Sequence, residues 1–185
     1  MILLPDEHWQ WVYDDQADNL YLDLSAEMQF LTAYKSKQLH ADAKLGSEFT
    51  LDDTSHYFHL LECISELPFA EVERVQMVLN AVTLMRFMKL STPQSWHFRE
   101  FNLMRYAPLL GEVVTLATDY GYADFLVIEP GENASVCMLM SGNLALTEDK
   151  VVEAHQAVKV MNNRLIPFCA VNSALMEQTR ALQSA

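Results

Sequence analysis

The sequence predicts an α+β fold in two domains, an α/β domain over residues 1–91 and a β-rich domain over residues 92–185. Two runs near the amino end alternate apolar and polar residues, and one run over residues 69–89 repeats apolar residues at helical spacing. Short alternating runs separated by turn residues fill the second half of the chain. We therefore expect a small antiparallel sheet with two helices, followed by a twisted, barrel-like sheet.

The amino-terminal alternation predicts a β-hairpin. Two runs of period 2 flank a polar turn at residues 14–19, which indicates two half-buried strands. The apolar members of these runs are Trp9, Trp11, Tyr13, Leu20, Leu22 and Leu24. They share one large face in a segment, residues 6–27, that has seven carboxylates and no Lys or Arg. Such a face either covers a core or forms an open pocket for another protein, and the pattern leaves both alternatives open.

The next elements are a third strand, a loop and a first helix. Alternating apolar residues predict the strand at residues 28–34, and the polar stretch at 35–48 is typical of a loop. Thr50 and Asp53 match a capping box with Asp in the fourth place, which predicts a helix over about residues 53–66.

The strongest helical pattern follows, over residues 69–89. Its apolar residues form two stripes, so this helix must be covered on more than one side. Beyond it, strands are expected at residues 113–118, 125–129, 135–140 and 144–146. Apolar residues repeating every three or four positions predict a last helix over 151–165, and the tail from about residue 172 is expected to fray.

Composition limits the class of protein. A net charge of −13 argues against a nucleic-acid partner, because binding phosphates needs a basic stripe. The apolar runs are far shorter than the roughly 20 residues of a membrane span, and the acidic amino end does not match a secretory signal. We expect a cytoplasmic protein without membrane insertion, in which Cys63, Cys137 and Cys169 are reduced, buried thiols.

No motif for catalysis or cofactor binding is present in the sequence. The glycines are isolated, so there is no phosphate-binding loop, and no GxSxG elbow presents a nucleophile. His56 and His59 have a spacing that metal ligands can use, but nothing nearby completes a ligand set. We expect no enzyme activity, no metal and no cofactor. The alternative is a small cytosolic hydrolase or ligand-binding protein that uses the aromatic pocket.

Several short blocks, collinear from about residue 5 to residue 168, match one known family. The blocks are Pro5-Asp6 with Trp9-x-Trp11-x-Tyr13-Asp14, Leu22-Asp23-Leu24, Val78-Leu79-Asn80-Ala81, Pro93-x-Ser95-Trp96-His97-Phe98, Gly131-Glu132-Asn133-Ala134, and Ala157-Val158-Lys159-Val160-Met161-Asn162-Asn163-Arg164-Leu165. Through them the chain resembles the ZapC family, cytoplasmic cell-division factors of the gammaproteobacterial Z-ring.

The resemblance implies a non-enzymatic partner of FtsZ, the tubulin-like GTPase that polymerises into the division ring. ZapC-like proteins are recruited to midcell by FtsZ, promote lateral association of its protofilaments and lower its GTP turnover. The implied fold has an N-terminal α/β domain with a large hydrophobic pocket and a C-terminal β-rich domain with an electropositive tray.

Both implied sites have candidate residues in this chain. The pocket would be supplied by Leu22, Leu24, Trp9 and Trp11, and the basic patch by Arg86, Lys89, His97, Arg99 and Arg105. The chain departs from the family pattern at Gln94, where members carry a basic residue.

Two chemically distinct sites favour a monomer that makes two contacts and prefers polymerised, GTP-bound FtsZ. Under this hypothesis Leu22→Arg abolishes binding with the fold intact, and charge reversal at Lys89 weakens binding in a salt-sensitive way.

Overall fold

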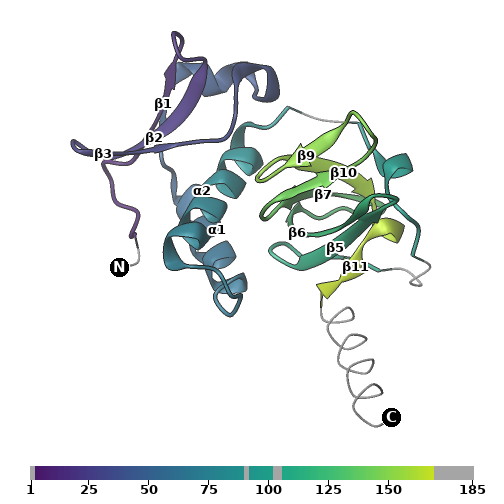
Figure 1. Cartoon of the computed structure of the whole chain (residues 1–185). Coiled ribbons are helices and arrows are strands. Elements are labelled where there is room, and N and C mark those ends of the chain that lie inside the picture. Colours follow the sequence, from purple (N-terminus) through teal and green to yellow (C-terminus); the bar gives the residue numbers. More distant parts are fainter. Residues whose placement is uncertain (1–2, 90–91, 102–105, 169–185) are drawn as a thin grey trace. The chain divides into compact units, whose positions relative to one another are not determined.

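The computed structural model describes residues 3–89, 92–101 and 106–168 (Figure 1). The chain divides into two compact units, Met1–Leu90 and Ser91–Ala185. The first combines a four-stranded antiparallel sheet with two helices, and the second is built from a five-stranded and a two-stranded antiparallel sheet. The predicted α+β class is confirmed.

The sheet of the first unit is built around the predicted hairpin. Its strands, in the order β3-β2-β1-β4, are β1 (Gln10–Asp14), β2 (Asn19–Ser25), β3 (Met28–Leu31) and β4 (Ser47–Glu48). The polar turn forms because the Asp14 carboxylate accepts hydrogen bonds from the backbone N–H groups of Gln16 and Ala17, at 2.8 and 3.1 Å. Trp11 of β1 then pairs with Leu22 of β2, which confirms the hairpin.

The segment predicted as a loop at residues 35–48 is more regular than expected. It contains two 3₁₀ turns, η1 (Ser36–Gln38) and η2 (Ala41–Leu45), before β4. Leu39 and Ala43 are buried and anchor these turns. Leu39, Ala41, Ala43 and Leu45 alternate with polar residues, but only Leu39 and Ala43 are buried, so the alternation does not reveal the turns.

Two helices complete the first unit. α1 (Leu51–Cys63) begins at the predicted capping box: Thr50 Oγ1 accepts from the Asp53 N–H at 3.2 Å, and Asp53 Oδ2 accepts from the Thr50 N–H at 2.8 Å. α2 (Glu71–Phe87) has eight consecutive buried residues, from Met77 to Leu84. Burial on all sides of these turns is what the two apolar stripes predicted.

The second unit is a sheet protein. The five-stranded sheet has the order β10-β7-β6-β5-β11, with β5 (Val113–Thr118), β6 (Gly121–Glu129), β7 (Ala134–Leu139), β10 (Ala157–Met161) and β11 (Ile166–Pro167). β8 (Asn143–Ala145) and β9 (Val151–Glu153) form the two-stranded sheet. β10 and β11 are the outer strands of the larger sheet, so within the described ranges it is open and not a closed barrel.

The helix predicted over residues 151–165 is wrong. This segment contains β9, β10 and the 3₁₀ turn η4 (Asn162–Arg164). In β10, Val158 and Val160 are buried on the face that joins the core. Their spacing of two residues is that of a strand, and it prevails over the helical spacing of Val151, Ala154 and Val158. The tail expected to fray from residue 172 lies outside the described residues.

Two further expectations can be compared with the structure. Cys137 is a buried free thiol as expected, whereas Cys63 is free but exposed, and Cys169 lies outside the described residues. No helix in the described part of the chain combines the length and apolar character needed to cross a bilayer.

Candidate partner-binding surfaces

The four apolar side chains predicted to line a pocket belong to a closed core. Leu22 and Trp11 are 0% and 1% exposed, and Trp9 and Leu24 are 2% and 7% exposed. The rings of Trp9 and Phe49 meet edge to face with centroids 5.1 Å apart, which seals this side of the sheet. Of the two alternatives left open by the hairpin pattern, the covered core is the one observed, and the open pocket is wrong.

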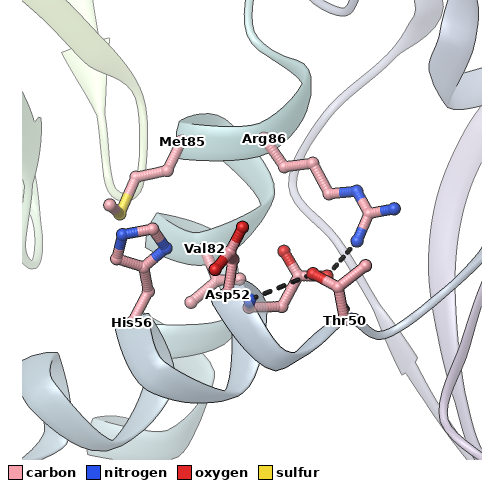
Figure 2. A pocket seen from close by; sticks show the side chains of 7 residues that line it. Thr50, Asp52, His56, Val82, Met85 and Arg86 are labelled. Atoms are coloured by element: carbon pink, nitrogen blue, oxygen red, sulfur yellow. Dashed lines mark hydrogen bonds and ion pairs between the residues drawn. The ribbon is translucent and has the colours of Figure 1, made fainter.

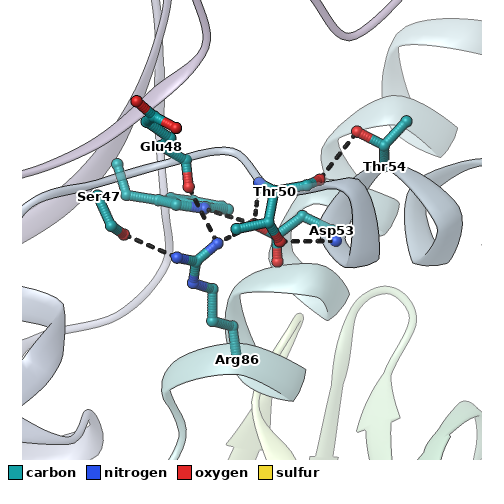
Figure 3. Close-up of polar contacts among 7 residues, drawn as sticks. Ser47, Glu48, Thr50, Asp53, Thr54 and Arg86 are labelled. Carbon is teal, nitrogen blue, oxygen red and sulfur yellow. Dashed lines mark hydrogen bonds and ion pairs between the residues drawn. The ribbon is translucent and has the colours of Figure 1, made fainter. Parts of the chain in front are cut away.

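Arg86, predicted as part of a basic patch, instead joins four elements of the first unit (Figure 3). Its guanidinium forms an ion pair with Asp53 and donates to the carbonyl oxygen of Glu48 at 3.1 Å and to Ser47 Oγ at 2.9 Å. The same carboxylate accepts from the indole N–H of Trp11 at 3.4 Å. These contacts tie α2 to α1, β4 and β1.

The burial of this pair decides its role. The Asp53 side chain is 5% exposed and that of Arg86 is 21% exposed. A carboxylate in such a site needs a cation and hydrogen-bond donors, because losing its hydration is costly. The charge of Arg86 is therefore used inside the unit, where it stabilises the buried Asp53 carboxylate.

Substitution of Arg86 by Met is expected to destabilise the first unit by about 3–5 kcal/mol, because it leaves the buried Asp53 carboxylate without its cation. Denaturant unfolding measures this loss. Arg99→Met is the matched control: Arg99 is 61% exposed in its ion pair with Asp119, so its loss should cost at most about 1 kcal/mol. Equal stability of the two variants would contradict the structural role of Arg86.

A small cavity of about 290 Å³ lies beside this ion pair (Figure 2). It is lined by Thr50, Asp52, Asp53, His56, Val82, Met85 and Arg86. Neither Trp9 nor Trp11 lines it, so it gives no support to a ligand-binding protein that uses the aromatic residues. Within the described ranges, no group of three or more His, Cys, Asp or Glu residues could hold a metal ion.

Lys89 is the exposed cation of the first unit among the predicted site residues. Its ammonium group donates to the carbonyl oxygens of Ser36 and Lys37, at 3.1 and 3.2 Å. These acceptors are neutral, so the positive charge of Lys89 remains available at the surface.

The second unit presents a large exposed aromatic side chain at η3 (Ser95–His97). Trp96 is 72% exposed, whereas the neighbouring Ser95 is buried and accepts a hydrogen bond from the Met161 N–H at 2.8 Å. The Gln94 N–H donates to the carbonyl oxygen of Lys159 at 2.7 Å. Two hydrogen bonds, at Gln94 and Ser95, thus fix the turn to β10, while the Trp96 indole is exposed to solvent.

A lysine from a distant part of the sequence lies beside this turn. Lys150 Nζ donates to Gln94 Oε1 at 3.0 Å, and within the described ranges it makes no ion pair. We call the group Gln94, Trp96, His97 and Lys150 the Trp96 surface. Gln94, at which the sequence departs from the resembled family, therefore has a lysine ammonium group in contact with its side chain.

His97 contributes a neutral ring to the Trp96 surface and not a cation. The Trp96 indole N–H donates to His97 Nε2 at 3.1 Å, which requires an unprotonated nitrogen. Partial desolvation and, second, the positive charge of Lys150 lower the pKa of His97 below its ordinary 6.5. Both the hydrogen bond and the lowered pKa favour the neutral ring, so His97 adds less positive charge than its place in the predicted patch assumed.

The remaining predicted cations are Arg99 and Arg105. Arg99 forms an exposed ion pair with Asp119 at 3.1 Å. Arg105 lies outside the described residues. The structure thus divides the predicted patch between two units, with Arg86 and Lys89 on the first and His97 and Arg99 on the second.

Sequence reasoning left Trp96 and Lys150 out of the site. The sequence did hint that Trp96 is exposed, because it lies between the polar residues Ser95 and His97 and belongs to no apolar stripe or alternation. Lys150 had none, because it is 56 positions from Gln94 and follows two acidic residues. Only the pairing of β8 with β9 forms the turn that carries it.

Comparison with known proteins covers both units. Models of the N-terminal and C-terminal parts of the cell-division protein ZapC match residues 2–89 and 91–171. Proteins named cell division protein ZapC from Tolumonas auensis, Aeromonas hydrophila and Aliivibrio salmonicida are 43%, 41% and 38% identical to this chain. The alignments cover 95%, 90% and 94% of this chain and 98%, 93% and 97% of the relatives.

Proposed function

The chain belongs to the ZapC family of cell-division proteins, and from that premise we propose that it binds polymers of FtsZ as a non-enzymatic factor of the Z-ring. It acts in the cytoplasm, is recruited to midcell by FtsZ, and promotes lateral association of the protofilaments. The cell-division role rests on the family, and the proposed contact with FtsZ rests on the exposed residues of the two units.

The observation that supports this proposal best is the exposed Trp96 beside Lys150. Trp is among the residues that most often dominate the binding energy of protein interfaces, because it buries a large area at little conformational cost. The indole is 72% exposed on a turn that two hydrogen bonds fix to β10, one to the Ser95 hydroxyl and one from the Gln94 N–H, so it is preorganised for such burial.

The charge of the chain sets a condition on this contact. A net charge of −13 opposes approach to another acidic surface, but exposed charges are screened beyond about 8 Å at physiological salt. Close to the interface, the nearest charges decide the interaction. Lys150 at the Trp96 surface and Lys89 on the first unit are the cations that we propose for it.

Lateral association requires two contacts for each cross-link. We favour a monomer with one contact on each unit, since the exposed candidates of the two units differ in chemistry. A ligand that prefers the polymer shifts the population toward it, and the slower exchange of subunits would lower GTP turnover.

Sedimentation with purified FtsZ tests the function. The protein should pellet with FtsZ in GTP, should stay in the supernatant in GDP, and should lower the rate of phosphate release over the same concentration range in which it pellets. A parallel spin without FtsZ is the control. Equal recovery in GTP and GDP would contradict the preference for polymers, and no recovery in either would contradict the proposed function.

A further inference from the structure

Within the described ranges, strand β3 forms an unpaired edge of the sheet in the first unit. It is the outermost strand in the order β3-β2-β1-β4, and Met28 and Leu31 are 50% and 63% exposed. The Thr32 N–H donates to the Leu20 carbonyl oxygen at 3.1 Å, so this pair is a hydrogen-bonded pair of the antiparallel ladder. Such pairs alternate, and Gln29 and Leu31 are therefore the residues whose N–H and C=O groups point away from β2.

An apolar row on the outer face of the sheet ends at the same edge. Trp11, Leu22 and Phe30 are in register and face the core, so the adjacent row of Val12, Tyr21 and Leu31 lies on the opposite face. Val12 and Tyr21 are half-buried and Leu31 is exposed. A strand added beside β3 would place alternate side chains next to Leu31 and extend this row.

The edge is short and bulged but carries no charge or Pro of its own. Natural sheets protect their edges with short strands, bulges, Lys, Pro, charged inward residues or a covering element. β3 has four residues, and its pairing with β2 shifts register between Asp23 and Ser25. β3 has the sequence Met-Gln-Phe-Leu, without Pro or charge. Asp23 lies one strand inside this edge, where it accepts from Gln29 Nε2 at 2.7 Å, and Glu27 stands exposed in the turn before β3.

We propose that β3 accepts an extended segment of the partner polymer as an additional strand. In this segment apolar side chains that pack on Leu31 alternate along the chain with Lys or Arg side chains that approach Asp23 and Glu27. The inference rests on the proposed function and assigns β3, besides Lys89, to the contact on the first unit.

The charge around β3 selects this occupant over a second copy of the chain. Residues 6–34 carry seven carboxylates and no Lys or Arg. Lys44 pairs with Asp15 and Lys35 donates to the Ala17 carbonyl oxygen, so these two cations serve the β1–β2 turn, whereas Asp23 and Glu27 are the carboxylates next to β3. Pairing two copies through β3 would bring two such segments together, and like charges in neighbouring strands are destabilising. A basic and apolar segment complements both the charge and the exposed row.

Hydrogen–deuterium exchange of the full chain tests the inference directly. In the free protein the outward-facing amides of Gln29 and Leu31 should exchange rapidly, and saturating FtsZ polymers in GTP should slow their exchange by tenfold or more. Unchanged exchange at β3 while the protein pellets with FtsZ would overturn the inference and leave the proposed function standing. Protection that grows with the concentration of the protein alone would assign the edge to a second copy and also overturn it. Failure to pellet would overturn both.

A matched pair of variants gives an independent readout. Leu31→Lys adds a charge at the edge, and the same change at Leu45, which is 81% exposed in η2, is the control. We expect Leu31→Lys to weaken binding to FtsZ polymers about tenfold and Leu45→Lys to bind like the wild type, with equal thermal unfolding of both. Equal affinity of the two variants would overturn the inference.

Discussion

Replacing Leu22 by Arg is expected to unfold the first unit. Leu22 is fully buried, in register between Trp11 and Phe30. The change removes a core leucine, which alone costs about 2–5 kcal/mol, and adds a charge without a partner, which costs several more. The total is comparable with the whole stability of a domain of this size, about 5–15 kcal/mol. The sequence-based hypothesis, which expected loss of binding with the fold intact, is corrected on this point.

Tryptophan fluorescence and thermal unfolding measure this effect. Trp9 and Trp11 are buried, so unfolding of the first unit should shift their emission to longer wavelength. Leu45→Arg is the control, since it makes the same change at an exposed leucine and should leave the emission and the melting temperature unchanged. A Leu22→Arg variant that unfolds like the wild type but does not bind FtsZ would contradict the closed core and support the open-pocket hypothesis.

Replacing Trp96 by Ala should have the largest effect on binding. Loss of a central Trp anchor typically costs 2 kcal/mol or more, which is about a 30-fold weaker affinity. Because the side chain is 72% exposed, stability should change by no more than about 0.5 kcal/mol. A titration by sedimentation with FtsZ in GTP gives the dissociation constant.

Tyr122→Ala is the matched control for this variant. Tyr122 is an aromatic residue of the same unit, on β6, and is 73% exposed. The Trp96 surface predicts near wild-type binding for Tyr122→Ala. The reverse order of affinities would place the contact on the β5–β6 side of the unit.

The elements of the fold were largely readable from periodicity. The hairpin, the capping box of α1, the doubly striped α2 and strands β5 to β8 follow local patterns that the structure keeps. The segment from Val151 to Leu165 was not readable, because its spacing fits both periods. Val151 and Met161, which the helical stripe would bury, are 46% and 39% exposed, and burial of Val158 and Val160 against the sheet decided between them.

The candidate site was less predictable, for two physical reasons. Alternation tells which side chains share a face but not whether another element covers that face, so Trp9 and Leu22 could be core or pocket. The sequence likewise does not show which carboxylate, if any, pairs with a given Lys or Arg. Arg86 pairs with Asp53, 33 positions away, so its charge is neutralised. Lys150 contacts only the neutral amide of Gln94, so its charge stays available.

Photo-cross-linking from position 96 tests the central claim most directly. A photoreactive phenylalanine derivative placed at position 96 retains an aromatic ring on the fixed turn, and the same derivative at position 122 serves as the comparison. An adduct with FtsZ that forms in GTP from position 96, and not from position 122, is the predicted result. An adduct from position 122 alone, or from neither position while the protein pellets with FtsZ, would contradict the account.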